Sequence, residues 1–175
     1  DILNKLKHSK SPVPDEMHPA MLKLLSENLA PPLASLFNKS LSSGKLPEDW
    51  KMATITPLPK KGSRCEAANY RPVSLTSVLC KVLETIIRNR MIGFLEQERL
   101  LTTAQHGFTH GRSCLTNLLT MMENLSKRCD EDDEVEAVFL DLSKAFDTVN
   151  HRLLLRKLES YCISKMVIKW ISSFL

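Results

Sequence analysis

The sequence predicts an α+β fold, because helix-like and strand-like segments alternate along its 175 residues. Two short β-branched segments, 52–58 and 70–75, flank a polar, glycine-containing connection and predict a β-hairpin. Segment 78–95 repeats apolar residues at helical spacing, and the Thr-Ser pair before it can cap a long helix. Segment 135–141 contains a continuous apolar run, which is typical of a strand buried on both faces. Hydrophobic residues make up 43% of the chain, enough for a real core.

The N-terminal part predicts a loosely held segment followed by two helices. Residues 1–16 are expected to be frayed, since prolines remove backbone donors and end helices. Residues 18–29 are helix-like, and an apolar stripe within 33–41 indicates a second helix that Gly44 ends as a C-cap. The prolines that set these boundaries are Pro12 and Pro14, and then Pro31 and Pro32, where the chain is expected to restart.

The part after the long helix predicts three further helices and one more strand. The loop 105–113 leads into a helix that Ser113 caps and that presents one apolar face. An acidic loop follows, and then the buried strand that ends at Asp141. Two helices, 150–161 and 164–175, come last. The order of helices, hairpin, helices, strand and helices supports the α+β class.

The charge of the chain is unevenly distributed. The formal net charge is +4, but six acidic residues lie between 130 and 136. Without these six, 24 basic residues face 14 acidic ones, a net charge of +10. A basic region opposed to an acidic patch indicates a polyanionic partner such as nucleic acid, and an ordinary solvated surface is the alternative.

The cysteines and the apolar runs exclude several classes of protein. The five cysteines are odd in number and none forms a Cys-x-x-Cys pair, so we expect buried thiols in a reducing compartment instead of a zinc site or a disulfide framework. No apolar run reaches the roughly 18 residues of a membrane span, and no signal-peptide pattern opens the sequence. The expected protein is intracellular, not secreted and not in a membrane. The first residue is not Met, which suggests a piece of a longer chain.

Asp141 directly follows the apolar run of the predicted strand. A carboxylate at the edge of a core is costly to desolvate unless it is hydrogen-bonded or binds a cation. Mg²⁺ prefers oxygen ligands, often one or two carboxylates with water and phosphate, so a metal ligand is one interpretation. An Asp that caps the next helix is the other, and the pattern alone leaves both open.

The residues around Asp141 resemble a known sequence motif. Phe-Leu-Asp-Leu-Ser-Lys-Ala-Phe-Asp-Thr-Val-Asn-His at 139–151 is similar to the first polymerase motif of non-LTR (LINE-type) retrotransposon reverse transcriptases. Five other segments resemble this family in the family's order: Trp-Lys-Met-Ala-Thr-Ile-Thr-Pro-Leu-Pro-Lys-Lys-Gly (50–62), Asn-Tyr-Arg-Pro-Val-Ser-Leu-Thr-Ser (69–77), Gln-His-Gly-Phe (105–108), Gly-Arg-Ser (111–113) and Trp-Ile-Ser-Ser-Phe (170–174).

The resemblance implies an organisation in parts. After the N-terminal segment 1–16, residues 17–134 correspond to a fingers subdomain of helices plus a β-hairpin. Residues 135–175 correspond to the start of a polymerase palm, with the first catalytic motif and the helices after it. The palm is incomplete, because the family's Pro-Gln-Gly segment and Ala-Asp-Asp turn follow the last motif matched here.

The resemblance also implies roles around Asp141. It makes Asp141 the catalytic carboxylate and a ligand of the Mg²⁺ ions, with the backbone carbonyl of Leu142 as a further ligand. Phe146 corresponds to the aromatic residue beneath the sugar of the incoming dNTP, where a bulky ring would clash with a 2′-hydroxyl. The alternative for Phe146 is an ordinary core aromatic.

The resemblance also implies binding roles for the hairpin and for the loop after the long helix. Arg71 corresponds to a residue that contacts the triphosphate of the dNTP, and the planar guanidinium suits phosphate. Lys60 or Lys61 would add a charge at the hairpin tip, and exposed basic turn residues are the alternative. The residues that correspond to positions near the template path are Gln105, Arg112 and Ser113.

These correspondences imply that the chain is part of an RNA-directed DNA polymerase and is inactive alone. The full-length polymerase would act on an RNA template and a DNA primer. We expect it in the nucleus or the cytoplasm, since the family must reach DNA. A non-catalytic nucleic-acid-binding remnant and an inert relic of a decayed element are the alternatives. One departure is Val13 and Glu16, which stand where the family has glycines, and glycine alone tolerates some backbone conformations.

Overall fold

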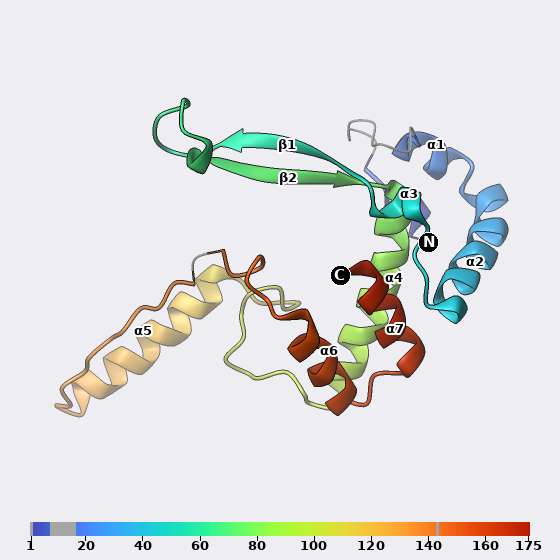
Figure 1. The fold of residues 1–175 in the computed structure, drawn as a ribbon. Coiled ribbons are helices and arrows are strands. Elements are labelled where there is room, and N and C mark those ends of the chain that lie inside the picture. Colours follow the sequence, from blue (N-terminus) through green and yellow to red (C-terminus); the bar gives the residue numbers. More distant parts are fainter. Residues whose placement is uncertain (1, 8–16, 143) are drawn as a thin grey trace. The chain divides into compact units, whose positions relative to one another are not determined.

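The computed structural model describes residues 2–7, 17–142 and 144–175 (Figure 1). The chain divides into two compact units, a first unit of residues 1–93 with 151–175 and a second unit of residues 94–150. Helices and one two-stranded antiparallel sheet make up the described structure, which agrees with the predicted α+β class. The positions of Val13 and Glu16, and of the two prolines between 8 and 16, lie outside the described residues.

The core of the first unit forms around α4 (Val78–Gln97). This helix follows the apolar periodicity of the sequence, and Ser77 caps its start by accepting a hydrogen bond of 3.2 Å from the backbone N–H of Cys80. Leu3, from the short 3₁₀ helix η1 (Leu3–Lys5), is also buried in this core. Part of the segment expected to be frayed is therefore packed. The other buried members of the cluster are Leu22, Phe37, Leu46, Trp50, Val78, Cys80, Val82, Leu83, Ile87 and Trp170.

The break between the first two α-helices falls at a different residue from the one expected. Helix α1 (Pro19–Leu24) has Leu25 as its C-cap, and α2 (Ser26–Ser43) continues through Pro31 and Pro32. The two prolines leave the carbonyls of exposed residues in the first turns of α2 without an N–H donor, and water can satisfy them.

The C-terminus of α2 matches the prediction. Gly44 has the left-handed conformation, with φ of 64°, and its N–H donates to the carbonyl of Leu41 at 3.0 Å. The N–H of Lys45 donates to the carbonyl of Ser40 at 3.2 Å, which completes a Schellman motif. The short helix α3 (Glu48–Lys51) follows and was not expected from the sequence; it places Trp50 in the core, with its ring edge-on to Phe37.

The predicted β-hairpin is present. Strand β1 (Ala53–Pro59) pairs antiparallel with β2 (Tyr70–Thr76), and the short helix η2 (Ala67–Asn69) precedes β2. Every residue of β1 is exposed. Figure 1 shows the hairpin extending from the helices of its own unit as a two-stranded ribbon. The side chains of β1 are therefore available to a ligand on both faces.

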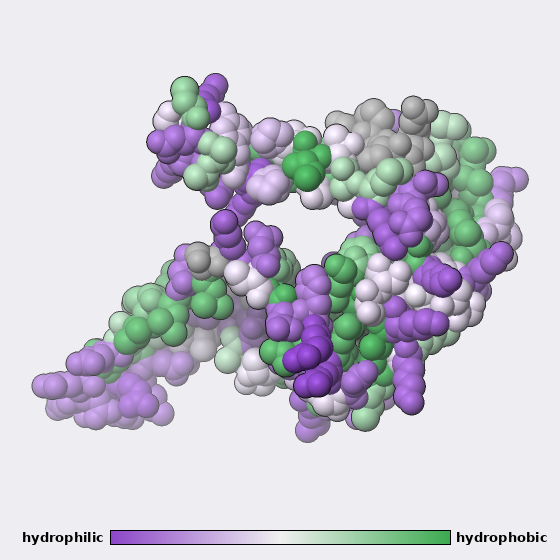
Figure 2. Space-filling model, in the orientation of Figure 1, coloured by the Kyte–Doolittle hydropathy of each residue, from purple (hydrophilic) through white to green (hydrophobic). Residues whose placement is uncertain are grey.

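The second unit is dominated by α5 (Cys114–Asp130), whose predicted cap is confirmed. The hydroxyl of Ser113 accepts from the N–H of Thr116 at 3.2 Å, and the hydroxyl of Thr116 accepts from the N–H of Ser113 at 2.9 Å. This capping box satisfies two N–H groups that the helix itself leaves unpaired. In the view of Figure 2 apolar residues gather over α5, and four residues of its apolar face are at least half exposed: Leu115, Leu118, Leu119 and Met122.

The expected strand at 135–141 is not formed, so this prediction is wrong for the structure described here. The segment 133–142 has no regular secondary structure, and Val138, Phe139 and Leu140 are all at least 78% exposed. A strand buried on both faces needs hydrogen-bonding neighbours, and β1 and β2, the strands among the described residues, pair with each other. The segment therefore has the residue pattern of a strand, but the described residues provide no neighbouring strand with which it pairs.

The last two helices agree with the prediction, and the cysteines only in part. Helices α6 (His151–Ser160) and α7 (Lys165–Phe174) pack on each other in the first unit. All five cysteines are free thiols as expected, but Cys80 alone is buried and the other four are exposed. None of the helices in the described part of the chain combines the length and the apolar character that a membrane crossing requires.

Candidate functional site

Two of the predicted phosphate-binding residues lie on one face of the hairpin. The register pairs Leu58 with Arg71, and the N–H of Lys60 donates to the carbonyl of Asn69 at 2.6 Å, two pairs further out. Side chains alternate between the faces of a strand, so Lys60, Leu58 and Arg71 project from the same face. Lys60 and Arg71 are diagonal neighbours there, a spacing that long side chains bridge.

The cations of the hairpin are exposed and available. Arg71, Lys60 and Lys61 are solvent-exposed, and none of them takes part in the ion pairs found among the described residues. Lys61 lies in the bend beyond the paired strands, so the sheet does not fix its direction as it does for Lys60. An anion that lies over Leu58 would therefore be close to two positive charges whose direction the strands fix, Lys60 and Arg71. Lys61 would add a third, mobile charge.

In the loop before α5, the residues predicted to lie near the template make hydrogen bonds within the loop itself or with the start of the helix. The guanidinium Nη1 of Arg112 donates to the carbonyl of Thr103, and more distantly to that of Gln105 at 3.4 Å. The side-chain amide of Gln105 donates to the carbonyl of Gly107 at 3.0 Å. Ser113 is occupied as the cap of α5. These three residues shape the loop and the helix start, and Arg112 keeps part of its guanidinium for other partners.

Asp141, Leu142 and Phe146 are all solvent-exposed residues of the second unit. The ring of Phe146 is 78% exposed and meets the ring of Phe108 edge to face, with centroids 6.0 Å apart and planes at 86°. Phe146 is therefore not a core aromatic in this structure. Phe108 is itself 93% exposed and has a φ of 59°, a left-handed conformation that is rare for a bulky residue.

Comparison with known proteins identifies the family. Residues 58–175 match the family described as reverse transcriptase (RNA-dependent DNA polymerase). The chain belongs to this family. Its relatives are retrotransposon polymerases of the non-LTR kind, as the sequence motifs indicated.

Three relatives define the similarity. The chain is 33% identical over 91% of its length to the "Probable RNA-directed DNA polymerase from transposon BS" of Drosophila melanogaster. It is 30% identical over 99% of its length to the "RNA-directed DNA polymerase from mobile element jockey" of Drosophila funebris. It is 30% identical over 77% to the "Retrovirus-related Pol polyprotein from type-1 retrotransposable element R2" of Popillia japonica. The aligned regions make up 18%, 19% and 18% of these relatives, so the chain spans less than a fifth of their length.

The reverse transcriptase residues described here do not by themselves form a metal centre. Reverse transcriptases generally use a divalent metal, but the described residues contain no group of three or more His, Cys, Asp or Glu side chains that could hold one. Asp141 offers one carboxylate and Leu142 one carbonyl oxygen, whereas Mg²⁺ demands six oxygen ligands in octahedral geometry.

The sequence motifs assign no separate role to Asn69, Tyr70 or Phe108. Asn69 and Tyr70 both bond the hairpin loop that contains the basic residues. Phe108 belongs to the Gln-His-Gly-Phe motif, and its contact with Phe146 joins two motifs that are 38 residues apart. An aromatic residue directly after a glycine in a polar loop was the one available signal for an exposed ring.

Proposed function

We propose that this chain is the nucleotide-holding part of an RNA-directed DNA polymerase that copies an RNA template onto a DNA primer. In this proposal residues 17–134 act as fingers and 135–175 as the start of the palm. The observation that supports it is the exposed hairpin face, on which Lys60 and Arg71 lie as diagonal neighbours without acidic partners among the described residues. Such a face fits the triphosphate of a dNTP, which has several anionic oxygens at this spacing.

The chemistry of the proposed reaction assigns a task to each group. The 3′-hydroxyl oxygen of the primer attacks the α-phosphorus of the dNTP and loses its proton to water, and pyrophosphate leaves with the electrons of the broken P–O bond. Arg71 and Lys60 neutralise and orient the β- and γ-phosphates, which holds the α-phosphorus in place for attack. Phe146 lies beneath the sugar and excludes a 2′-hydroxyl. Gln105, Arg112 and Ser113 support the template from the loop before α5.

Asp141 is proposed as one ligand of a Mg²⁺ site that other parts of a longer protein complete. The carbonyl of Leu142 would be a second ligand. Mg²⁺ would stabilise the charge that develops on the transferred phosphate. Asp141 is exposed, so its carboxylate is free to join further ligands. The parent protein would act in the nucleus or the cytoplasm, where it can reach DNA.

The test compares the polymerase activity of a longer protein that contains this chain with the activity of the chain alone. RNA-templated incorporation of labelled dNTP by the longer protein should fall by at least about a hundredfold in Asp141→Ala, as expected for a group that acts in the transition state. Glu136→Ala, which removes a nearby exposed carboxylate, is the matched control and should change the rate by less than twofold. The 175-residue chain should not incorporate nucleotide above its own Asp141→Ala variant. Equal activity of Asp141→Ala and Glu136→Ala would exclude the proposed role.

A non-catalytic nucleic-acid-binding function is the second candidate, and the unpaired hairpin cations favour it too. Binding of an RNA/DNA duplex to the chain should then weaken steeply with salt, because phosphate contacts release counterions. Lys60→Ala and Arg71→Ala should each lower the salt slope by about one. Binding that does not depend on salt would exclude this function. A cooperative thermal unfolding transition of the monomer would separately exclude an inert, unfolded relic.

A further inference from the structure

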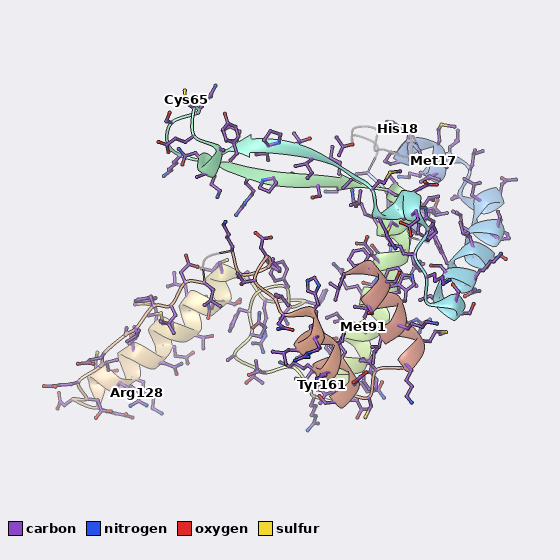
Figure 3. The ribbon with its side chains drawn as sticks, in the orientation of Figure 1. Met17, His18, Cys65, Met91, Arg128 and Tyr161 are labelled. Atoms are coloured by element: carbon purple, nitrogen blue, oxygen red, sulfur yellow. The ribbon has the colours of Figure 1, made fainter. Side chains whose placement is uncertain are left out.

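The loop at the hairpin tip, residues 60–69, brings three basic residues together at a site where no core supports them. Lys60, Lys61 and Arg64 are all exposed, and the whole loop is exposed or half-buried. Figure 3 shows the loop, with Cys65 labelled, at the far end of the two strands. A loop in solvent needs its own hydrogen bonds to hold one conformation, because burial contributes little to it.

Asn69 supplies those bonds. Its side-chain Nδ2 donates to the carbonyl of Ser63 at 2.9 Å and to Oε2 of Glu66 at 3.1 Å. Its backbone carbonyl accepts from the N–H of Lys60 at 2.6 Å. One residue therefore bonds the start, the middle and the end of the loop, and both hydrogens of its amide are used.

Two neighbours complete the arrangement. The hydroxyl of Tyr70 donates to the carbonyl of Arg64 at 2.8 Å, which ties the far side of the loop to β2. Gly62 has a φ of 119°, and a Cβ added there would lie 2.7 Å from Nδ2 of Asn69. The chain thus crosses the Asn69 amide at a distance and in a conformation that only glycine allows.

We propose that Asn69 is a positioning residue for the basic tip, which holds Lys60, Lys61 and Arg64 in the geometry that meets phosphate without touching the substrate itself. The inference rests on the proposed function, in which the hairpin contacts the triphosphate of a dNTP. Its structural basis is independent of that function, because both hydrogens of the Asn69 amide are used inside the loop.

The first test measures the loop itself in the 175-residue chain. Trypsin cleaves after Lys60, Lys61 and Arg64, so its rate at these sites reports how often the loop opens. Asn69→Ala removes both side-chain hydrogen bonds and should raise this rate by at least about fivefold. Asn69→Asp has the same size but sets a carboxylate against the Ser63 carbonyl and the Glu66 carboxylate, so it should open the loop at least as much. Ser74→Ala, an exposed change in β2, is the matched control and should leave the rate unchanged.

A rescue variant separates a specific bond from a general loss of order. Combining Asn69→Asp with Glu66→Gln lets the amide of residue 66 donate to the carboxylate of residue 69, which reverses the direction of one hydrogen bond. Cleavage of the double variant should return part of the way to the wild-type rate. No recovery, together with an unchanged rate in Asn69→Ala, would overturn the proposal.

The second test measures polymerisation by the longer protein. Asn69→Ala should raise the KM for dNTP by about fivefold and leave kcat within twofold, because binding before chemistry is affected. A faster tryptic rate with an unchanged KM would support the positioning role and exclude the proposed triphosphate contact. A raised KM with an unchanged tryptic rate would overturn the positioning role, since Asn69 would then act on the substrate directly.

Discussion

The indole N–H of Trp170 donates a hydrogen bond of 3.0 Å to the hydroxyl of Ser40, a residue 130 positions earlier in the chain. Both side chains are buried, and the Ser40 hydroxyl in turn donates to the carbonyl of Lys45 at 2.7 Å. Three residues after Trp170, the hydroxyl of Ser173 accepts from the N–H of Leu46 at 3.3 Å. The Trp-Ile-Ser-Ser-Phe motif thus fastens α7 to the end of α2, which gives it a structural role in the first unit.

Removal of the Ser40 hydroxyl should destabilise the chain. Ser40→Ala leaves the buried indole N–H of Trp170 and the carbonyl of Lys45 without partners, and the expected loss is about 1–3 kcal/mol. Ser42→Ala removes an exposed hydroxyl that bonds the carbonyl of Lys39 in the same helix, and it should change stability by less than about 0.5 kcal/mol. Urea unfolding midpoints of the two variants give the comparison. Equal midpoints would mean that the Trp170 bond contributes nothing.

Two glycine substitutions should act in opposite directions. Gly44→Ala places a Cβ at a φ of 64° and within 2.5 Å of the Lys169 side chain. Lys169 can move, so the left-handed backbone dominates, with a loss of about 1–2 kcal/mol. Gly93→Ala lies in α4 with nothing within 4 Å, and it should stabilise the chain by about 0.5–1 kcal/mol. Thermal unfolding of both variants tests the signs, and a stabilised Gly44→Ala would contradict the conformation of this cap.

Local signals in the sequence predicted most of the helices, the hairpin and their ends. Gly44, Ser77 and Ser113 act within a few residues of their own positions, so their capping roles can be read from neighbouring residues. The continuation of α2 through Pro31 and Pro32 could not be read in this way. The first unit buries Phe37 of this helix, and such tertiary contacts outweigh the local preference of proline.

Burial of Cys80 should make its thiol less reactive than the other four. Burial, and then the hydrogen bond to Glu84, raises the pKa of the Cys80 thiol to about 12, from 9.0. A thiol reacts as thiolate, so at pH 8 iodoacetamide should modify the four exposed cysteines of the folded chain and leave Cys80 intact. Cys80→Ala should accept the same number of labels as wild type. One label fewer in that variant would show that Cys80 reacts in the native state.

The same pKa shift predicts a pH dependence of stability. The folded chain holds the Cys80 proton more tightly than the unfolded chain, whose thiol ionises near 9.0. The stabilisation is therefore complete below pH 9 and is lost as the pH rises towards 12. The difference in unfolding free energy between wild type and Cys80→Ala should shrink over this range. Urea titrations at pH 8, 10 and 11 measure it, and a constant difference would contradict the shift.

Sequence similarity proposes residues for the candidate site but does not give their geometry. Motif similarity selected Arg71, Lys60 and Asp141, and the strand register then placed the first two on one face. The exposure of Asp141 could not be read from the sequence, because a strand forms only where neighbouring strands accept its hydrogen bonds. The role of Asn69 was equally hidden, since its partners depend on the path of an exposed loop.

Phe146 should control the choice of sugar in the longer protein if it lies beneath the incoming nucleotide. Phe146→Val removes the bulky ring, and incorporation of ribonucleotides relative to deoxynucleotides should rise by about tenfold or more. Phe108→Ala removes the ring that contacts Phe146 but not the ring itself, so it should change this ratio much less. Competitive incorporation assays measure the ratio. Equal effects of the two variants would assign the selectivity to the aromatic pair.

Prolines should protect the hairpin from strand addition. The N–H of Lys60 points to β2, so alternate residues of β1 point their N–H groups outward, and Pro57 and Pro59 occupy outward positions. Pro72, opposite Pro57, does the same for β2. Prolines lack the N–H that another strand would need, so pairing of a further strand with either open edge of this exposed two-stranded sheet is disfavoured.

Replacing both prolines of β1 should therefore promote self-association. The variant with Pro57→Thr and Pro59→Thr restores two outward donors and adds β-branched side chains, and light scattering should show oligomers at concentrations where wild type is monomeric. Leu58→Thr, whose N–H points to β2, changes a side chain between the two prolines and leaves the edge as it is. It should remain as monodisperse as wild type. If the double variant also stays monomeric, the edge prolines are not what keeps the hairpin free, and the twist of the two-stranded ribbon becomes the better explanation.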